Sequence, residues 1–164
     1  MELCKTLAAS SSDGLFAQLG ALIEAEILIG SEEGCRFAHE EHRLALQAEL
    51  DPETRRRAKQ ALGDFLLTMP DASVVDRLRA GVHLMDSGEP RGADIAAAAS
   101  LRIGLYQLDQ LGEALPALED ALARFRSQRR PTRELVSLLA PLALAGFYAH
   151  RHYAARYGEP AVAA

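Results

Sequence analysis

The sequence predicts a mainly α-helical fold that contains one short β-hairpin. Alanine and leucine, both strong helix formers, dominate the 164 residues, tryptophan is absent, and aromatic residues make up only 5%. A hydrophobic content of 49% beside 25% charged residues is typical of a globular protein. Apolar residues recur at helical spacing along most of the chain, and one segment has the pattern of two short strands.

Residues 1–50 predict helices followed by the hairpin. A short helix over 1–9 ends at a serine cluster, and a helix over 12–26 follows because its apolar residues fall on one helical face. Two apolar runs around a polar loop with glycine at both ends predict a hairpin at 27–38. Helix, helix and hairpin in this order is the layout of a winged-helix domain, in which the ribbon lies on the neighbouring helices.

The hairpin leads directly into another helix. The segment 39–50 has helical spacing, and we expect Leu44, Ala45 and Ala48 to face inward. Phe37 and Leu44 are the expected buried anchors of this segment.

Residues 51–86 predict two connecting helices. Asp51 is placed to cap the first and Pro52 to occupy its first helical position. The second covers about 72–85, and the breaker run 86–92 that follows is the expected internal boundary. The residues expected to be buried are, in order, Ala58, Ala61, Leu62, Phe65 and Leu66, then Val74, Val75, Leu78, Val82 and Met85.

Residues 93–164 predict an antiparallel helical array. Its helices cover roughly 93–108, 112–128 and 132–149, and the short polar turns between them are typical of antiparallel neighbours. A further helical pattern begins at Tyr153 and stops in an apolar run, so we expect the chain to be part of a longer protein.

Two linked motifs carry a resemblance to a known family. The first is Arg36-Phe37-x-His39-Glu40-x-x-Arg43-x-Ala45-Leu46-x-x-Glu49-Leu50, and the second is Pro52-Glu53-x-Arg55 with Ala61-Leu62-Gly63. Residues 1–68 thereby resemble the winged-helix segment of bacterial STAND-type signalling ATPases, which include LuxR-type regulators and serine/threonine kinases fused to an ATPase. In that family a nucleotide-binding domain precedes the winged helix and tetratricopeptide-like repeats follow it.

The C-terminal array resembles the tetratricopeptide repeat. Ala114, Leu118 and Ala121 match the small-large-small pattern of the repeat's second helix. Leu101 and Leu105 lie where its first helix has large apolar residues. The chain departs from the repeat at Arg102, where a small residue is expected, and at Arg126, where proline is expected. The resemblance implies one degenerate repeat, with a truncated successor over 138–157, that binds a protein or peptide. An ordinary helical hairpin is the alternative.

His39 is the candidate contact to a ligand. In the STAND family, a histidine at this place can reach the diphosphate of a nucleotide held by the ATPase domain, a role that suits an imidazole. This chain has no GxxxxGK[ST] phosphate loop, so the nucleotide must come from a nucleotide-binding domain outside it, and no cofactor of its own is expected. The alternative is a structural histidine that caps the helix or packs under the hairpin.

The charge distribution argues against DNA as a partner. The net charge is −5, and residues 1–50 carry three basic side chains against nine acidic ones. The helix over 12–26, which occupies the recognition position of a winged helix, contains no lysine or arginine, and Glu32 and Glu33 lie at the hairpin tip. Because DNA-binding proteins gain affinity by neutralising phosphates, repulsion is expected to dominate.

Basic and aromatic clusters in the C-terminal half are the candidate partner-binding residues. They are Arg124, Arg126, Arg129 and Arg130, with Tyr148, Tyr153 and Tyr157. The arginines can receive an acidic partner, or they can complement the negative end of a helix dipole. The tyrosines either pack against the next repeat or form a partner or homodimer interface. A second basic run, residues 55–59, is interpreted as a solvated helix face.

Neither catalysis nor metal binding is expected. His39 and His42 share a helical face but lack a third ligand, and no pairing of base and nucleophile is visible. Cys4 and Cys35 make no disulfide framework, which favours reduced thiols in the cytoplasm. No apolar run approaches the roughly 20 residues that a bilayer requires, so no membrane contact is expected.

Together these patterns predict a non-catalytic regulatory and protein-interaction segment of a STAND-type signalling ATPase. Its role would be to couple a nucleotide switch to a helical-repeat sensor. The alternative is a winged-helix DNA-binding transcriptional regulator.

Overall fold

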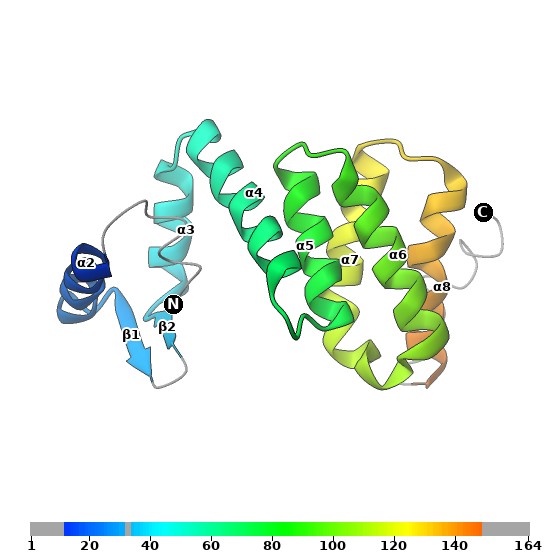
Figure 1. Ribbon diagram of the computed structural model, residues 1–164, viewed down its shortest axis with the longest axis horizontal. Helices are drawn as coiled ribbons and strands as arrows, with labels where there is room; N and C mark the ends of the chain where they lie inside the picture. Colours follow the sequence, from blue (N-terminus) through cyan, green and yellow to red (C-terminus); the bar gives the residue numbers. More distant parts are fainter. Residues whose placement is uncertain (1–11, 32–33, 149–164) are drawn as a thin grey trace. The chain divides into compact units, whose positions relative to one another are not determined.

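The computed structural model describes residues 12–31 and 34–148 (Figure 1). The chain divides into two compact units, which we call the N-terminal unit (Met1–Ala61) and the C-terminal unit (Leu62–Ala164). The division falls within a helix, α4 (Pro52–Thr68). It does not fall at the expected boundary over 86–92, which is a turn inside the C-terminal unit. The expected helix over 1–9 lies outside the described residues.

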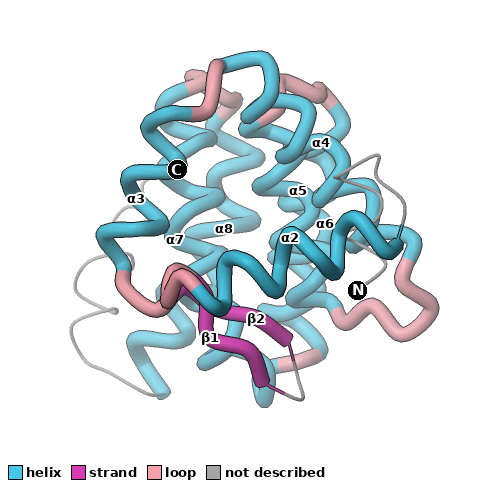
Figure 2. Tube along the Cα trace, turned by 90° about the vertical axis from the view of Figure 1, so that its left-hand side faces the viewer, coloured by secondary structure: helices cyan, strands magenta, loops and turns pink. Residues whose placement is uncertain are grey.

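The described part of the N-terminal unit contains the helices predicted over 12–26 and 39–50, beside a two-stranded antiparallel sheet (Figure 2). Its elements are α2 (Ser12–Glu24), β1 (Leu28–Ser31), β2 (Gly34–Phe37) and α3 (Glu40–Glu49), followed by the first part of α4. Leu28 lies opposite Phe37 in the sheet, and Ile29 lies opposite Arg36. The sequence prediction of a hairpin between two helices is therefore confirmed.

A left-handed residue ends α2 and turns the chain into β1. Glu26 has a φ of 56°, and the backbone N–H of Ile27 donates to the carbonyl of Leu22 at 3.0 Å. This bond pattern is the Schellman motif, in which glycine usually occupies the left-handed position. The hairpin therefore begins immediately after the helix, without a longer connection.

The N-terminal unit has almost no hydrophobic core among its described residues. Leu28 is the one described apolar side chain of this unit that is buried, while Phe37 is half-buried. The prediction that Leu44 is a buried anchor is wrong, because its side chain is 52% exposed and Ala45 and Ala48 are exposed as well. The reason is that α3 packs mainly on β2, so no described element of this unit covers the face on which these residues lie.

The capping prediction for α4 is confirmed. The carboxylate of Asp51 accepts a hydrogen bond from the backbone N–H of Thr54 at 2.9 Å, and Pro52 is the first helical residue. Hydrogen bonds from the Thr54 side chain and backbone lower the pKa of Asp51. The residues expected to be buried on this helix are only half-buried, whereas Gly63 is fully buried.

The C-terminal unit consists of two helical hairpins that pack face to face. Its elements are the end of α4, then α5 (Val74–Asp86), α6 (Arg91–Tyr106), the short 3-10 helix η1 (Leu108–Gln110), α7 (Leu111–Ser127) and α8 (Thr132–Tyr148). In the first hairpin α5 packs on α6, and in the second α7 packs on α8 (Figure 1). Between the hairpins, α5 packs on α7 and α6 packs on α8. The four helices predicted from the apolar periodicity are therefore confirmed.

The hairpin partner of α6 is α5, whereas the repeat resemblance paired it with α7. Glycines explain this pairing, since a Cβ atom at Gly81 would lie 2.7 Å from the backbone nitrogen of Ala96. A Cβ atom at Gly92 would lie 2.6 Å from the backbone nitrogen of Met85. The absence of side chains at these two positions lets the backbones of α5 and α6 touch.

The core of the C-terminal unit lies between the two layers of helices. All five residues predicted to be buried on α5 are buried, and Leu118, Phe125, Leu138 and Leu142 from α7 and α8 are fully enclosed. A capping box fixes the start of α5: Asp76 N–H donates to the Ser73 hydroxyl at 3.1 Å, and Ser73 N–H donates to the Asp76 carboxylate at 3.0 Å.

Candidate functional site

His39 lies at the edge of a hollow in the N-terminal unit. The hollow measures about 490 Å³ and lies between the end of α2 and the hairpin; its lining residues are Ile23, Glu26, Leu28, Ile29, Gly30, Ala38 and His39. His39 is exposed at the N-cap position of α3, and its side chain makes no capping hydrogen bond. The structure therefore leaves the imidazole accessible, and the capping alternative is wrong.

His39 and His42 lie together without forming a metal site. Their ring centroids are 5.3 Å apart, and the rings meet edge to face. Within the described ranges, no group of three or more histidine, cysteine or acidic side chains is placed to hold a metal ion. The lining of the neighbouring hollow includes Glu26 and no lysine or arginine, so this hollow has no cationic cluster for a phosphate.

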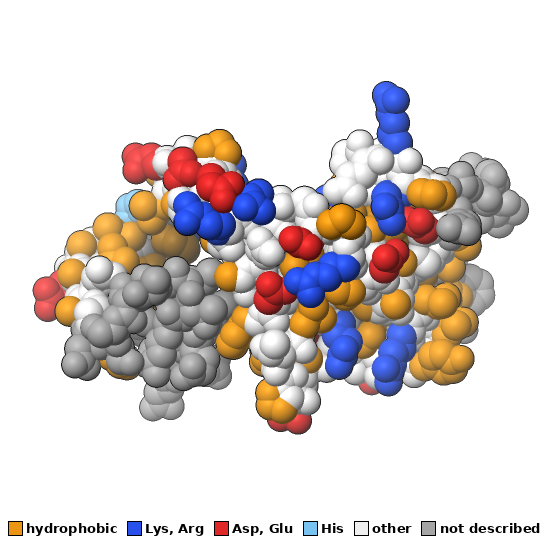
Figure 3. All heavy atoms as spheres, turned by 45° about the horizontal axis from the view of Figure 1, so that its top comes forward, with side chains coloured by type: hydrophobic (Ala, Val, Ile, Leu, Met, Phe, Trp, Pro, Cys, Tyr) orange, Lys and Arg blue, Asp and Glu red, His pale blue; other side chains and the backbone are white. Residues whose placement is uncertain are grey.

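Two of the four candidate arginines are held by partners in the C-terminal unit. Arg124 on α7 donates to Asp86 at the end of α5, with an Nη2–Oδ2 distance of 3.0 Å, and these hydrogen bonds raise the pKa of Arg124. Arg130 donates to Glu134 at 2.7 Å and lies 3.8 Å from Asp94. Figure 3 shows acidic and basic side chains interspersed on the face that it draws.

The other two arginines are accessible. Arg126 and Arg129 are exposed, and neither forms an ion pair with another residue in the part of the chain that the structure describes. Arg129 has a φ of 52°, and it ends α7 with the same bond pattern as Glu26, since Arg130 N–H donates to the Phe125 carbonyl at 3.0 Å. The predicted arginine cluster is thus divided between structural and accessible members.

Substituting Arg124 with alanine tests this division. We expect the free energy of unfolding to fall by about 1 kcal/mol, because a half-buried charged hydrogen bond between α5 and α7 is lost. Chemical denaturation measures the change. The matched control is Arg126→Ala on the same helix, which should change stability by less than about 0.5 kcal/mol. Equal effects of the two substitutions would contradict a structural role for Arg124.

The remaining candidates divide between exposed and undescribed residues. Arg55, Arg56 and Arg57 are exposed, as predicted for a solvated face, and Arg55 donates to the Gln47 and Leu50 carbonyls at the end of α3. Tyr153 and Tyr157 lie outside the described residues, as does the side chain of Tyr148 at the end of α8. The tyrosine interface therefore stays a prediction.

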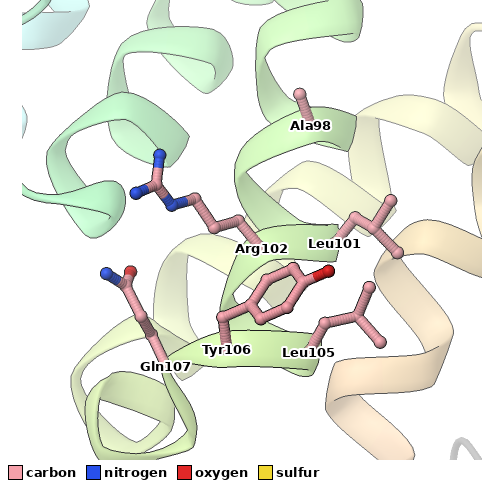
Figure 4. Close-up of a pocket in the computed structure, with 6 residues that line it drawn as sticks. All are labelled: Ala98, Leu101, Arg102, Leu105, Tyr106 and Gln107. Atoms are coloured by element: carbon pink, nitrogen blue, oxygen red, sulfur yellow. The ribbon is translucent and has the colours of Figure 1, made fainter.

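An apolar face of α6 was missed as a site by sequence reasoning. Leu101 is 48% exposed, Leu105 59% and Tyr106 79%, although the repeat resemblance assigned both leucines to packing positions. Next to them is a hollow of about 510 Å³, whose lining residues are Ala98, Leu101, Arg102, Leu105, Tyr106 and Gln107 (Figure 4). The available signal was Arg102 itself, because a charge stands where the repeat requires a small residue.

Comparisons with protein-family models, with curated proteins and with solved structures gave no match to this chain. Among the helices that the structure describes, none combines the length and the apolar character needed to cross a bilayer.

Proposed function

We propose that this chain is a non-catalytic regulatory and protein-interaction segment of a STAND-type signalling ATPase. In this proposal the N-terminal unit is a winged-helix-like domain, and the C-terminal unit is the start of a tetratricopeptide-like array. The chain would transmit the state of a nucleotide switch to the helical sensor.

The nearly absent core of the N-terminal unit is the observation that carries the proposal. Its described part buries one apolar side chain, Leu28, and leaves several large ones exposed: Phe16, Ile23, Ile29, Leu44, Leu46 and Leu50. A unit of this size needs buried apolar surface to be stable, and exposed apolar patches are typical of protein interaction sites. A domain lying against this surface would supply the missing burial.

His39 supports a nucleotide-binding domain as that partner. Its imidazole is exposed, makes no helix cap and borders an open hollow, so it is free to donate to a phosphate held elsewhere. The hollow itself has no basic side chain in its lining, which fits a phosphate held mainly by another domain.

Two measurements on the full chain test the proposal. Calorimetric titration with ADP and with ATP, together with a phosphate-release assay, should show neither tight binding nor hydrolysis. A mobility-shift assay with a random DNA duplex at low salt should show no shift, because α2 has no basic residue and the N-terminal region is acidic.

The two arms separate the alternatives. Either ATP hydrolysis or tight nucleotide binding by the isolated chain would contradict the proposal. A strong, salt-sensitive shift of the duplex would instead favour the DNA-binding regulator.

A further inference from the structure

The exposed face of α6 borders two adjoining hollows in the C-terminal unit. The hollow beside Tyr106 shares Ala98 and Arg102 with a second hollow of about 260 Å³. The second hollow lies where α4, α5 and α6 meet, and its lining residues are Leu67, Val74, Arg77, Ile95, Ala98, Ala99 and Arg102. We call the two together the α6 groove.

The floor of the α6 groove is apolar and belongs to the packed core. Val74 and Ala99 belong to the buried core, so the bottom of the groove is fixed by the packing of α5 on α6. Leu101 and Leu105, which line the neighbouring hollow, add exposed apolar surface on α6. Such a surface can bury the apolar side chains of another segment.

The two cations of the groove have no counter-ion among the described residues. Arg77 and Arg102 are exposed, and within the described ranges neither forms an ion pair. Other arginines of the unit do so: Arg79 with Asp76 and Glu113, Arg91 with Asp64, Arg124 with Asp86, and Arg130 with Glu134. No acidic residue lines either hollow, so the groove offers unneutralised positive charge beside apolar surface.

The length of the groove matches a helix. Its α6 residues run from Ile95 to Tyr106, which at 1.5 Å per residue is about 17 Å or three helical turns. In Figure 4 the guanidinium of Arg102 and the amide of Gln107 point to one side of α6, and Leu101 and Leu105 point to the other. A ligand that contacts both sides of α6 must therefore carry an apolar stripe beside a polar one.

We infer that the α6 groove binds an amphipathic helix of a partner protein, with acidic residues beside its apolar stripe. Leucine-type side chains at helical spacing contact Leu101, Leu105 and the groove floor, and glutamate or aspartate residues pair with Arg77 and Arg102. This inference rests on the proposed function and extends it, because it names the chemistry of the partner that the C-terminal unit binds.

Synthetic helices test the inference without a known partner. The probes are fluorescein-labelled peptides of about four turns with leucines on one stripe, flanked either by glutamates or by lysines. A third probe keeps the composition of the acidic one and carries a central proline that breaks the helix. Fluorescence anisotropy with the full chain should show that the acidic probe binds at least about tenfold more tightly than each of the others. Its affinity should fall as salt is added.

Charge reversal in the groove gives the decisive variant. The double substitution Arg77→Glu and Arg102→Glu should reverse the preference, so that the lysine-flanked probe binds more tightly than the acidic one. Leu105→Asp should remove binding of both helical probes. Arg57→Glu is the matched control, because Arg57 is also exposed but lies on the solvated face of α4 and lines neither hollow, and it should leave the preference unchanged. Circular dichroism verifies that each variant is folded.

Several outcomes would overturn the inference. They are the failure of all probes to bind the folded chain, equal binding of the acidic and basic probes, and undiminished binding of the proline probe. Sedimentation equilibrium covers a further case: if the chain alone forms a dimer that Leu105→Asp dissociates, the occupant is a second copy. None of these results bears on nucleotide or DNA binding, so failure here is distinguishable from failure of the proposed function.

Discussion

Replacing Gly81 with alanine is expected to destabilise the C-terminal unit by at least about 3 kcal/mol. The added Cβ atom would lie 2.7 Å from the backbone nitrogen of Ala96 and 2.8 Å from the carbonyl oxygen of Gly92. Both are backbone atoms, so no side chain can rotate away, and α5 must separate from α6. Overpacking typically costs about 1–3 kcal/mol, and rigid backbone contacts belong at the upper end or beyond. Urea denaturation followed by circular dichroism measures the loss.

Gly112→Ala is the control for this substitution. Gly112 is also helical, but beyond its chain neighbours and the adjacent backbone of its own helix no heavy atom lies within 4 Å of the position where its Cβ would stand. Alanine should therefore be neutral there or stabilise the chain by up to about 1 kcal/mol, through helix propensity and reduced entropy of the unfolded chain. If both glycine substitutions had the same effect, the direct backbone contact between α5 and α6 would be refuted.

Phe125→Ala is the second substitution with a large expected effect. Phe125 on α7 is fully buried in the core, with 0% of its surface exposed. Its truncation removes apolar contacts and leaves a cavity between the two helical layers, which should cost about 3–5 kcal/mol. Thermal and urea unfolding monitored by circular dichroism should both show the loss.

The same substitution at an exposed position supplies the comparison. Phe16 on α2 is 50% exposed, so Phe16→Ala should lower the stability of the chain by less than about 1 kcal/mol. A large loss at Phe16 would mean that the apolar surface of the N-terminal unit is already covered in the isolated chain. That result would remove the main support for the proposed partner.

Local patterns were sufficient to predict where helices and strands form. The apolar stripe of α5 gave its buried residues because a helix with one apolar face has only one way to bury it. Asp51 and Pro52 located the start of α4, and glycine at both ends of a polar loop located the hairpin. Each of these signals acts within a few residues and does not depend on the rest of the chain.

Burial in the N-terminal unit, and the pairing of side chains and helices that are distant in the sequence, could not be predicted in the same way. Leu44 lies at a helical spacing that implies a covered face, but the covering element must come from elsewhere, and the described part of the unit does not supply one. The pairing of Arg124 with Asp86 depends on how α7 meets α5, which no local pattern encodes. The pairing of α5 with α6 did have a sequence signal, namely two glycines placed where helix propensity disfavours them.

The glycine contact between α5 and α6 also has a consequence for the order of folding. Only the last part of α5, which ends at Asp86, and the short turn before α6 separate Gly81 from Gly92 in the sequence. Closing the loop between the two glycines therefore costs little entropy. Contacts of such short sequence separation form early, whereas those that join α5 to α7 or α6 to α8 must wait for longer loops to close. We therefore expect the α5–α6 hairpin, like the α7–α8 hairpin with its equally short turn, to form before the contacts that join the two hairpins.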